Sequence, residues 1–187
     1  MWSRIFYIIL LPFLYLLAAC QDQPGHKNSN TQVKSVAVAN SSMDSSKTIL
    51  ENISRDTSFS ILSRSLEATG LLDVLNKPGP FTVFAPTNAA FEKLPEGSLD
   101  GLLNERKNDL SNILSHHLVA GLLDQTDIEK SQKITTLAGE DLIITKRKDG
   151  IMINGLKINS RGIKNNNGII YIINDLLFPR NQNPGAY

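Results

Sequence analysis

Residues 81–91 read FTVFAPTNAAF and set the architecture of this chain. The first five are aromatic, β-branched or small, which is typical of a short buried strand, and Pro86 closes that strand. Thr87 or Asn88 can then cap a short helix over residues 89–94, because either side chain can accept a backbone N–H. The segment therefore predicts a strand that turns directly into a helix, with Phe91 folded back onto the sheet.

The chain before this segment is predicted to be helical. Phe59, Leu62 and Leu66 recur at the spacing of one helix face, with Ser58 as the N-cap and Gly70 as the stop. Further short helical patterns follow at residues 71–75, 99–103 and 110–115.

The second half of the chain changes to the alternation of β-strands. Residues 142–144 and 151–153 alternate around Asp149-Gly150, which predicts a hairpin, and Asn154-Gly155 predicts another tight turn. Residues 168–173 are apolar on both faces, which indicates a central buried strand. Helices followed by strands predict an α+β domain of about 130 residues.

Four segments of the chain resemble the fasciclin domain. Residues 81–91 resemble its first signature, and residues 167–179, NGIIYIINDLLFP, resemble its second. Between them, ILSHHLV at residues 113–119 lies where the family has a Tyr-His pair, and TLAG at residues 136–139 fits a further family step. The resemblance implies a wedge of two small β-sheets with helices along one side, over residues 47–180. It also implies a role in adhesion or extracellular interaction.

The signature positions are expected to encode the scaffold first, with interaction as a second role. The apolar members fill the core, and an Asn167-Gly168 pair that tolerates left-handed backbone leads into the central strand. The positions that the resemblance carries over are Thr82, Phe84, Pro86, Thr87, Asn88, Phe91, His116, His117, Asn167, Gly168, Tyr171 and Asn174.

The chain departs from the family pattern at the positions that bear on function. His116 replaces the Tyr of the Tyr-His pair, Tyr171 stands where the second signature has His, and Asn174 stands where it often has Asp. His117 remains, and we expect its ring to be buried and hydrogen-bonded to a backbone carbonyl.

Integrin binding is not expected. Animal members that bind integrins carry an Asp-Ile pair just before the second signature, and the matching pair here is Gly162-Ile163. A carboxylate is needed on the integrin's bound cation, which prefers oxygen ligands, and glycine has none. Asp127-Ile128 occurs elsewhere, but a dipeptide is weak evidence.

The N-terminus indicates export and lipidation. Residues 1–19 have a cationic start, a short apolar run and small residues at the end, as in a secretory signal peptide. Cys20, the single cysteine, follows directly and resembles the lipobox cysteine of bacterial lipoproteins, which is acylated by diacylglyceryl and amide-linked chains such as palmitate. The alternatives are an ordinary cleaved signal or an uncleaved anchor. Polar residues 20–46 predict a disordered tether, and residues 181–187 a C-terminal tail.

The near-zero net charge of the chain argues against strong electrostatic attraction to a highly charged partner. The sequence has 19 basic and 18 acidic residues, and removal of the signal peptide takes away only Arg4, which leaves the two signs balanced. No nucleic-acid partner is therefore expected. The basic run Lys146-Arg147-Lys148 lies beside the predicted hairpin turn, where a solvated loop is the first interpretation and a binding role the alternative.

Enzyme and metal chemistry find no support in the sequence. His116 and His117 are adjacent, and on a strand they would point to opposite faces and could not chelate one ion. The chain has no HExxH motif, no Gly-x-Ser-x-Gly elbow and no phosphate-binding glycine loop. No catalytic residue, metal ligand or cofactor is predicted.

The sequence thus predicts a lipid-anchored module of a bacterial cell envelope that works by adhesion or interaction. Its expected partners are the membrane, through the lipid on Cys20, and an envelope protein, a polysaccharide or a host surface. Gln21 after the cysteine, in place of Asp, favours the outer membrane, while the periplasmic or external face stays open. The alternative function is an envelope carrier of a small apolar ligand, a lipid or a pigment.

Overall fold

A computed structural model describes residues 43–159 and 161–180 of the 187-residue chain. The predicted signal peptide, Cys20, most of the predicted tether and the tail at residues 181–187 lie outside the described residues. Met43 packs against the core, and the Asp44 backbone exchanges hydrogen bonds with the side chain of Asn52. The folded part therefore already includes Met43–Ser46, which the sequence had suggested were tether.

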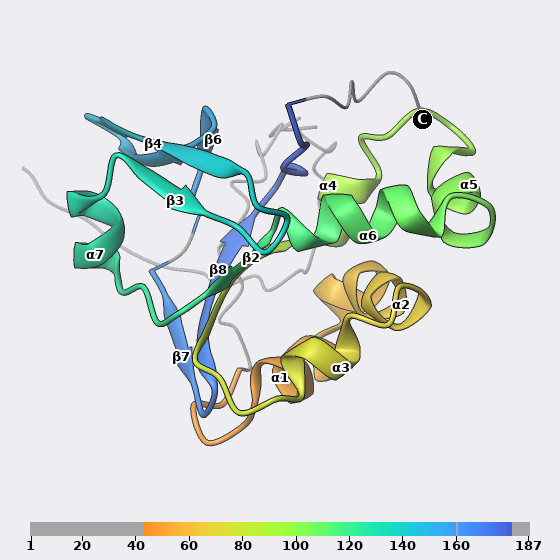
Figure 1. The fold of residues 1–187 in the computed structure, drawn as a ribbon, viewed down its shortest axis with the longest axis horizontal. Coiled ribbons are helices and arrows are strands. Elements are labelled where there is room, and N and C mark those ends of the chain that lie inside the picture. The colour runs from red at the N-terminus through yellow and green to blue at the C-terminus, as the bar shows by residue number, and fades with distance from the viewer. Residues whose placement is uncertain (1–42, 160, 181–187) are drawn as a thin grey trace, which may run out of the picture. The chain divides into compact units, whose positions relative to one another are not determined.

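Helices come first and strands dominate the second half, as the sequence predicts (Figure 1). The helices are α1 (Ile49–Arg55), the 3-10 helix η1 (Thr57–Phe59), α2 (Ser60–Ala68), α3 (Leu72–Leu75), α4 (Asn88–Phe91), α5 (Ser98–Asn104), α6 (Lys107–Ser115) and α7 (Gln125–Lys130). The strands are β1 (Phe81–Pro86), β2 (Leu118–Ala120), β3 (Lys133–Thr135), β4 (Asp141–Arg147), β5 (Gly150–Ile153), β6 (Leu156–Lys157), β7 (Ile163–Asn165) and β8 (Gly168–Ile173).

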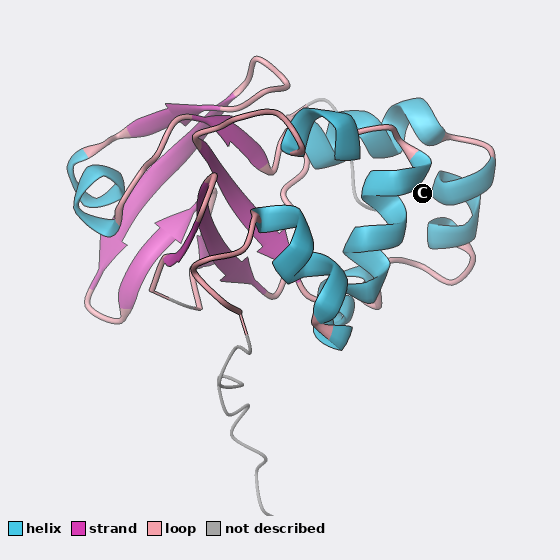
Figure 2. Cartoon of the chain, turned by 90° about the horizontal axis from the view of Figure 1, so that it is seen from below, coloured by secondary structure: helices cyan, strands magenta, loops and turns pink. Residues whose placement is uncertain are grey.

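The strands form two four-stranded sheets, in the orders β2-β1-β8-β7 and β3-β4-β5-β6. Within the first sheet, β1 and β8 are parallel neighbours at the centre, and their outer partners β2 and β7 run antiparallel to them. Most helices gather on one side of the domain and the sheets on the other, with α7 at the strand side (Figure 2). The α+β class and the two small sheets of the fasciclin wedge are confirmed.

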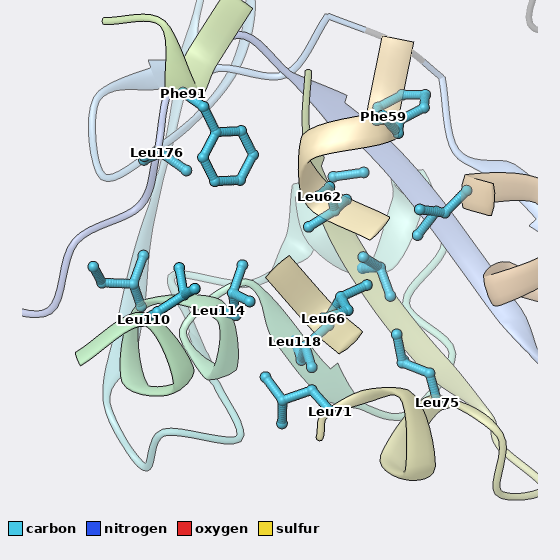
Figure 3. Close-up of a cluster of buried hydrophobic side chains, with 14 of the residues drawn as sticks. Phe59, Leu62, Leu66, Leu71, Leu75, Phe91, Leu110, Leu114, Leu118 and Leu176 are labelled. Carbon is cyan, nitrogen blue, oxygen red and sulfur yellow. The ribbon is translucent and has the colours of Figure 1, made fainter. Parts of the chain in front are cut away.

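Two hydrophobic clusters pack on opposite faces of the first sheet. Val83, Ala85 and Ile170 belong to the cluster that the helices cover, in which leucines from α2, α3 and α6 interdigitate (Figure 3). Phe84 and Tyr171 belong to the second cluster, which the other sheet covers. Because side chains alternate across a strand, β1 and β8 are buried on both faces, and this accounts for their continuous apolar sequence.

Capping side chains fix where the helices begin. Thr48 and Glu51 form a reciprocal capping box at α1, a helix that the sequence interpretation missed. The predicted cap at Ser58 is wrong, because α2 has Phe59 at its N-cap and no side-chain cap, and Asp56 caps the preceding η1 by accepting the N–H of Ser58. The aspartate is the better acceptor because its charged oxygen also meets the positive end of the helix.

Two smaller predictions also need correction. The helix after β1 ends at Phe91 rather than at residue 94, and the Thr87 side chain makes no capping hydrogen bond to it. Asn167 is not left-handed: among the described non-glycine residues, only Asn154 has a positive φ, of 49°. Asn154 and Gly155 (φ 84°) together form the predicted tight turn between β5 and β6.

Candidate functional site

The two signature segments, β1 and β8, meet at the centre of the first sheet. In their parallel register Thr82 lies opposite Ile169 and Phe84 opposite Tyr171. The Phe84 and Tyr171 rings stack with centroids 5.7 Å apart and planes at 28°. The signatures are therefore one buried structural unit rather than two surface motifs.

Polar residues of the first signature bond to the backbone of the domain itself. Thr82 is fully buried; its hydroxyl donates to the Gly121 carbonyl at 2.8 Å and accepts the Leu123 N–H at 2.9 Å. The Asn88 side chain accepts the Ile61 N–H at 3.0 Å and donates to the backbone of η1. Thr82 thus ties β1 to the loop after β2, and Asn88 ties the start of α4 to η1 and α2.

Polar residues of the second signature do the same on the other side of the sheet. The Asn167 side chain accepts the Ile49 N–H at 2.8 Å and donates to the Leu75 carbonyl at 2.9 Å, so it joins the first and third helices to β8. The Thr87 hydroxyl and the Asn174 side-chain oxygen lie 3.4 Å apart, which is a weak hydrogen bond. The amides of Asn88 and Asn167 are thus bonded within the domain, whereas the half-buried Asn174 has only this weak contact.

His116 and His117 lie on the turn that joins α6 to β2, not on a strand, so the premise that strand alternation separates them is wrong. Both side chains are buried. They differ completely in their hydrogen bonding.

The His117 ring is held at both nitrogens. Nδ1 lies 2.7 Å from the Ile113 carbonyl, and Nε2 accepts the Leu177 N–H at 2.9 Å. Because an amide can only donate, Nε2 must carry the lone pair and Nδ1 the proton. Burial lowers the pKa of His117 to about 4, so the ring is neutral and has no nitrogen left for a metal ion. The expected hydrogen bond to a backbone carbonyl is present.

The His116 ring has no hydrogen-bond partner at either nitrogen within the described part of the chain. Burial lowers the pKa of His116, while the nearby Glu140 carboxylate opposes that shift and Arg180 adds to it. The Arg180 N–H donates to the Glu140 carboxylate at 3.0 Å, which brings the C-terminal segment to this side of the domain. A buried polar ring without partners costs free energy that an apolar side chain would not.

Replacing His116 with leucine is expected to raise the free energy of unfolding by about 1–2 kcal/mol, because it removes two unpaired nitrogens at nearly constant volume. Urea unfolding followed by circular dichroism measures the change. His117→Leu is the matched control, since the same substitution at the adjacent, fully bonded ring must destabilise. A loss of stability in His116→Leu would mean that the imidazole makes a favourable polar contact.

Tyr171 fills the space beside Gly162. Its hydroxyl donates to the Leu123 carbonyl at 3.0 Å, and burial raises its pKa to about 12, with smaller contributions from Asp124 and Asp127. A Cβ at Gly162 would lie 2.7 Å from the Tyr171 hydroxyl oxygen. The position that would carry the integrin-binding carboxylate therefore has no room for a side chain as long as tyrosine occupies position 171.

A metal site, an apolar pocket and a membrane span each have requirements with which the described ranges can be compared. No group of three or more His, Cys, Asp or Glu side chains there could hold a metal ion. A cavity of about 350 Å³ opens at the turn between α5 and α6, but residues 104–109 that line it are all polar, so it cannot bury an apolar ligand. None of the helices described has the length and apolar character needed to cross a bilayer.

What remains available is the outer surface. Three large apolar side chains are notably exposed among the described residues: Leu122 at 50%, Leu137 at 39% and Ile143 at 43%. They lie on the loop after β2, on the β3–β4 turn and on β4, so they come from the strand side of the domain. These side chains are surface features, unlike the buried signature residues.

The family model of the fasciclin domain matches residues 57–179. The chain belongs to the fasciclin domain family. Its fold agrees with a solved fasciclin domain pair from the insect cell adhesion molecule fasciclin I, with a TM-score of 0.62 at 19% identity, over 71% of this chain and 51% of that one.

Curated relatives of this fasciclin domain occur in bacteria and in animals. Protein sll1483 of Synechocystis is 38% identical over 80% of this chain and 83% of its own length. The cell surface glycolipoprotein MPB83 of Mycobacterium bovis is 39% identical over 58% of this chain and 48% of its own. The transforming growth factor-beta-induced protein ig-h3 of Sus scrofa is 32% identical over 73% of this chain, which spans only 20% of that relative.

Sequence reasoning missed several residues that organise the fasciclin fold. Asn52 is buried and bonds to Asp44 and Asn165, and nothing in its local pattern separates it from a surface residue of α1. Leu177 was noted only as part of the second signature, although its N–H holds His117. The Thr48–Glu51 capping box could have been found, because Thr-x-x-Glu before an apolar pattern indicates a helix start.

Proposed function

We propose that this protein is a lipid-anchored module of a bacterial cell envelope that acts by adhesion or interaction and catalyses no reaction. Relatives support the surface role: one is named a cell surface glycolipoprotein, and the structural neighbour belongs to a cell adhesion molecule. The proposal extends that role to this chain.

One observation supports the proposal most directly. The side chains of Thr82, Asn88, Asn167 and His117 all hydrogen-bond to the domain's own backbone. Catalysis needs a nucleophile, acid or base that can reach a substrate with a suitable pKa. A pKa of about 4 for His117 and of about 12 for Tyr171, with both groups buried, leaves neither ready to transfer protons at neutral pH.

The anchor part of the proposal rests on Cys20 and the segment before it. Two or more acyl chains hold a protein on a bilayer where one chain is marginal. In cell fractionation, the wild-type chain should sediment with membranes and incorporate labelled palmitate. Cys20→Ser should do neither; if it stays in the membrane fraction with unchanged yield, lipid anchoring is wrong.

Exposure and adhesion need a separate experiment on intact cells. Protease shaving, read with an antibody to the folded domain, should remove the domain if it faces outward, and cells with the protein should adhere to a surface or matrix more strongly than cells without it. Protection until the outer membrane is permeabilised, together with unchanged adhesion, would contradict a role at the cell surface. Solvent extraction of the purified protein tests the carrier alternative, which no feature of the described residues favours.

A further inference from the structure

The balanced net charge of the chain conceals a strong segregation along it. Between residues 142 and 174 the basic residues are Lys146, Arg147, Lys148, Lys157, Arg161 and Lys164, and the single acidic residue is Asp149. Elsewhere the chain has an excess of acids. Counted from the start of β3, residues 133–174 have seven basic and three acidic residues, so the sheet formed by β3 to β6 and the segment after it keep an excess of positive charge.

Four of these cations surround the tip of the β4–β5 hairpin. Arg147 pairs with Gly150 and Lys146 with Ile151, so the two basic side chains project from opposite faces at the end of β4. Lys148 lies in the turn. Lys157 reaches the tip from β6, with its Cε 3.6 Å from the position of a Cβ on Gly150.

The charge at this tip is not neutralised within the domain. Lys157 lies 3.6 Å from Asp149, a pair that is about half exposed on both sides and so contributes little. Within the described ranges, Lys146, Arg147 and Lys148 form no ion pair with a carboxylate. By contrast, the exposed amines of Lys47, Lys93 and Lys133 each lie within 3.2 Å of a carboxylate.

The consecutive charges of Lys146, Arg147 and Lys148 repel one another through solvent, which is a weak effect because all three side chains are exposed. All residues from Thr145 to Gly150 are exposed, and the contacts with the core that fix the hairpin begin beside them, at the buried Ile144 and the half-buried Ile151. The tip therefore contributes nothing to packing that would explain its composition. A partner that supplies negative charge would remove the repulsion.

We propose that the β4–β5 hairpin tip is a binding site for an acidic polysaccharide, a linear polymer with repeated carboxylate, sulfate or phosphate groups. Cations on both faces and at the turn can follow such a polymer as it passes over the tip. This inference rests on the proposed adhesion function and names the partner class and the surface that engages it.

Two other polyanions fit the tip less well. Residues 141–158 include no aromatic side chain on which bases of a single-stranded nucleic acid could stack. An anionic membrane would attract the same charges, but the tip has no apolar residue to insert. The described chain also enters the domain at the other end: the Lys47 carbonyl accepts the Asn166 N–H at the β7–β8 turn, away from β4 (Figure 1).

The test is binding of the purified full-length protein, in detergent micelles, to immobilised alginate, with neutral dextran as the reference surface. We expect the triple variant Lys146→Gln/Arg147→Gln/Lys148→Gln to bind alginate about tenfold more weakly at low salt, with the difference vanishing as salt screens the charges. The matched control Arg64→Gln/Lys77→Gln/Lys107→Gln removes the same charge from exposed positions on the helical side, two in helices and Lys77 just after α3, and should change affinity less than about twofold.

Three outcomes would overturn the proposal: no binding of alginate above dextran, equal loss in both triple variants, or binding to phosphatidylglycerol vesicles or duplex DNA in preference to alginate. Retained near-native circular dichroism and unfolding midpoint show that the triple variant is folded. If cells with this variant still adhere as wild type does, the hairpin proposal fails while the adhesion function stands. If wild-type cells do not adhere at all but the hairpin variant loses alginate binding in solution, the hairpin site stands and the proposed adhesion function fails.

Discussion

Replacing Gly168 with alanine is expected to lower the free energy of unfolding by about 4 kcal/mol or more, a large part of the roughly 5–15 kcal/mol that stabilises a typical domain. Gly168 opens β8 with a φ of +155° and lies opposite Phe81 in the parallel pairing of β1 and β8. An added Cβ would lie 1.9 Å from the Phe81 carbonyl oxygen and 2.8 Å from Cδ1 of Ile49. Backbone atoms cannot yield as a flexible side chain can, so β1 and β8 would have to separate where their pairing begins.

Gly70→Ala is the matched control for this substitution. Gly70 also has a positive φ, of +72°, but nothing lies within 4 Å of its added Cβ. Gly70→Ala should therefore lower the free energy of unfolding only by the cost of the backbone strain, about 1–2 kcal/mol. Urea unfolding of both variants measures the difference. If the two costs agree within about 1 kcal/mol, the close approach of β1 and β8 does not fix the strand pairing.

Strands β1, β4, β5 and β8 could be predicted from local sequence because their patterns are complete within a few residues, whereas β2, β3 and β7 have three residues each and were missed. Residues 168–173 are apolar throughout, and Asn154-Gly155 can form the tight turn that its positive φ angles require. The parallel pairing of β1 with β8 could not be predicted from periodicity, since it joins segments from the two halves of the domain. The resemblance to the fasciclin family implied two small sheets but did not specify this pairing, which comes from the structure.

The hydrogen-bond partners of the signature side chains could not be predicted from local sequence either, because they lie far away along the chain. Asn167 bonds to Ile49 and Leu75, which precede it by 118 and 92 residues. The interpretation of His116 and His117 failed in its premise because α6 and β2 join within a turn, whose backbone follows neither period. A pattern that spans two residues cannot distinguish a strand from such a junction.

His117 makes the domain sensitive to acid. The imidazole has its ordinary pKa of 6.5 in the unfolded chain and a pKa of about 4 in the folded domain, where burial disfavours the charged ring. Above pH 6.5 both states hold a neutral ring, and its full contribution to stability is present. As the pH falls from 6.5 to about 4, the unfolded state takes up a proton that the folded state excludes, so the free energy of unfolding decreases. The total loss is about 3 kcal/mol.

His117→Leu should destabilise the domain at neutral pH and also weaken this dependence. In this variant the Ile113 carbonyl still accepts the backbone N–H of His116. The buried backbone N–H of Leu177, however, loses its acceptor. We expect a loss of about 2–4 kcal/mol at pH 7.5, measured by urea unfolding at pH values from 7.5 to 4.5.

The change in the free energy of unfolding with pH between pH 6.5 and 5 distinguishes His117 from the acidic groups. The carboxylates with lowered pKa values, such as Asp44 and Glu51, take up protons mainly below that range, because their ordinary values are 3.8 and 4.5. His116 acts in the same direction as His117, since burial also lowers its pKa, so His116→Leu must be measured in parallel. If the slope of the wild type persists in His117→Leu and vanishes in His116→Leu, then the unpaired ring is the acid-sensitive group. If it falls in His117→Leu, the ring that joins α6 to the segment after β8 governs how the domain responds to acid.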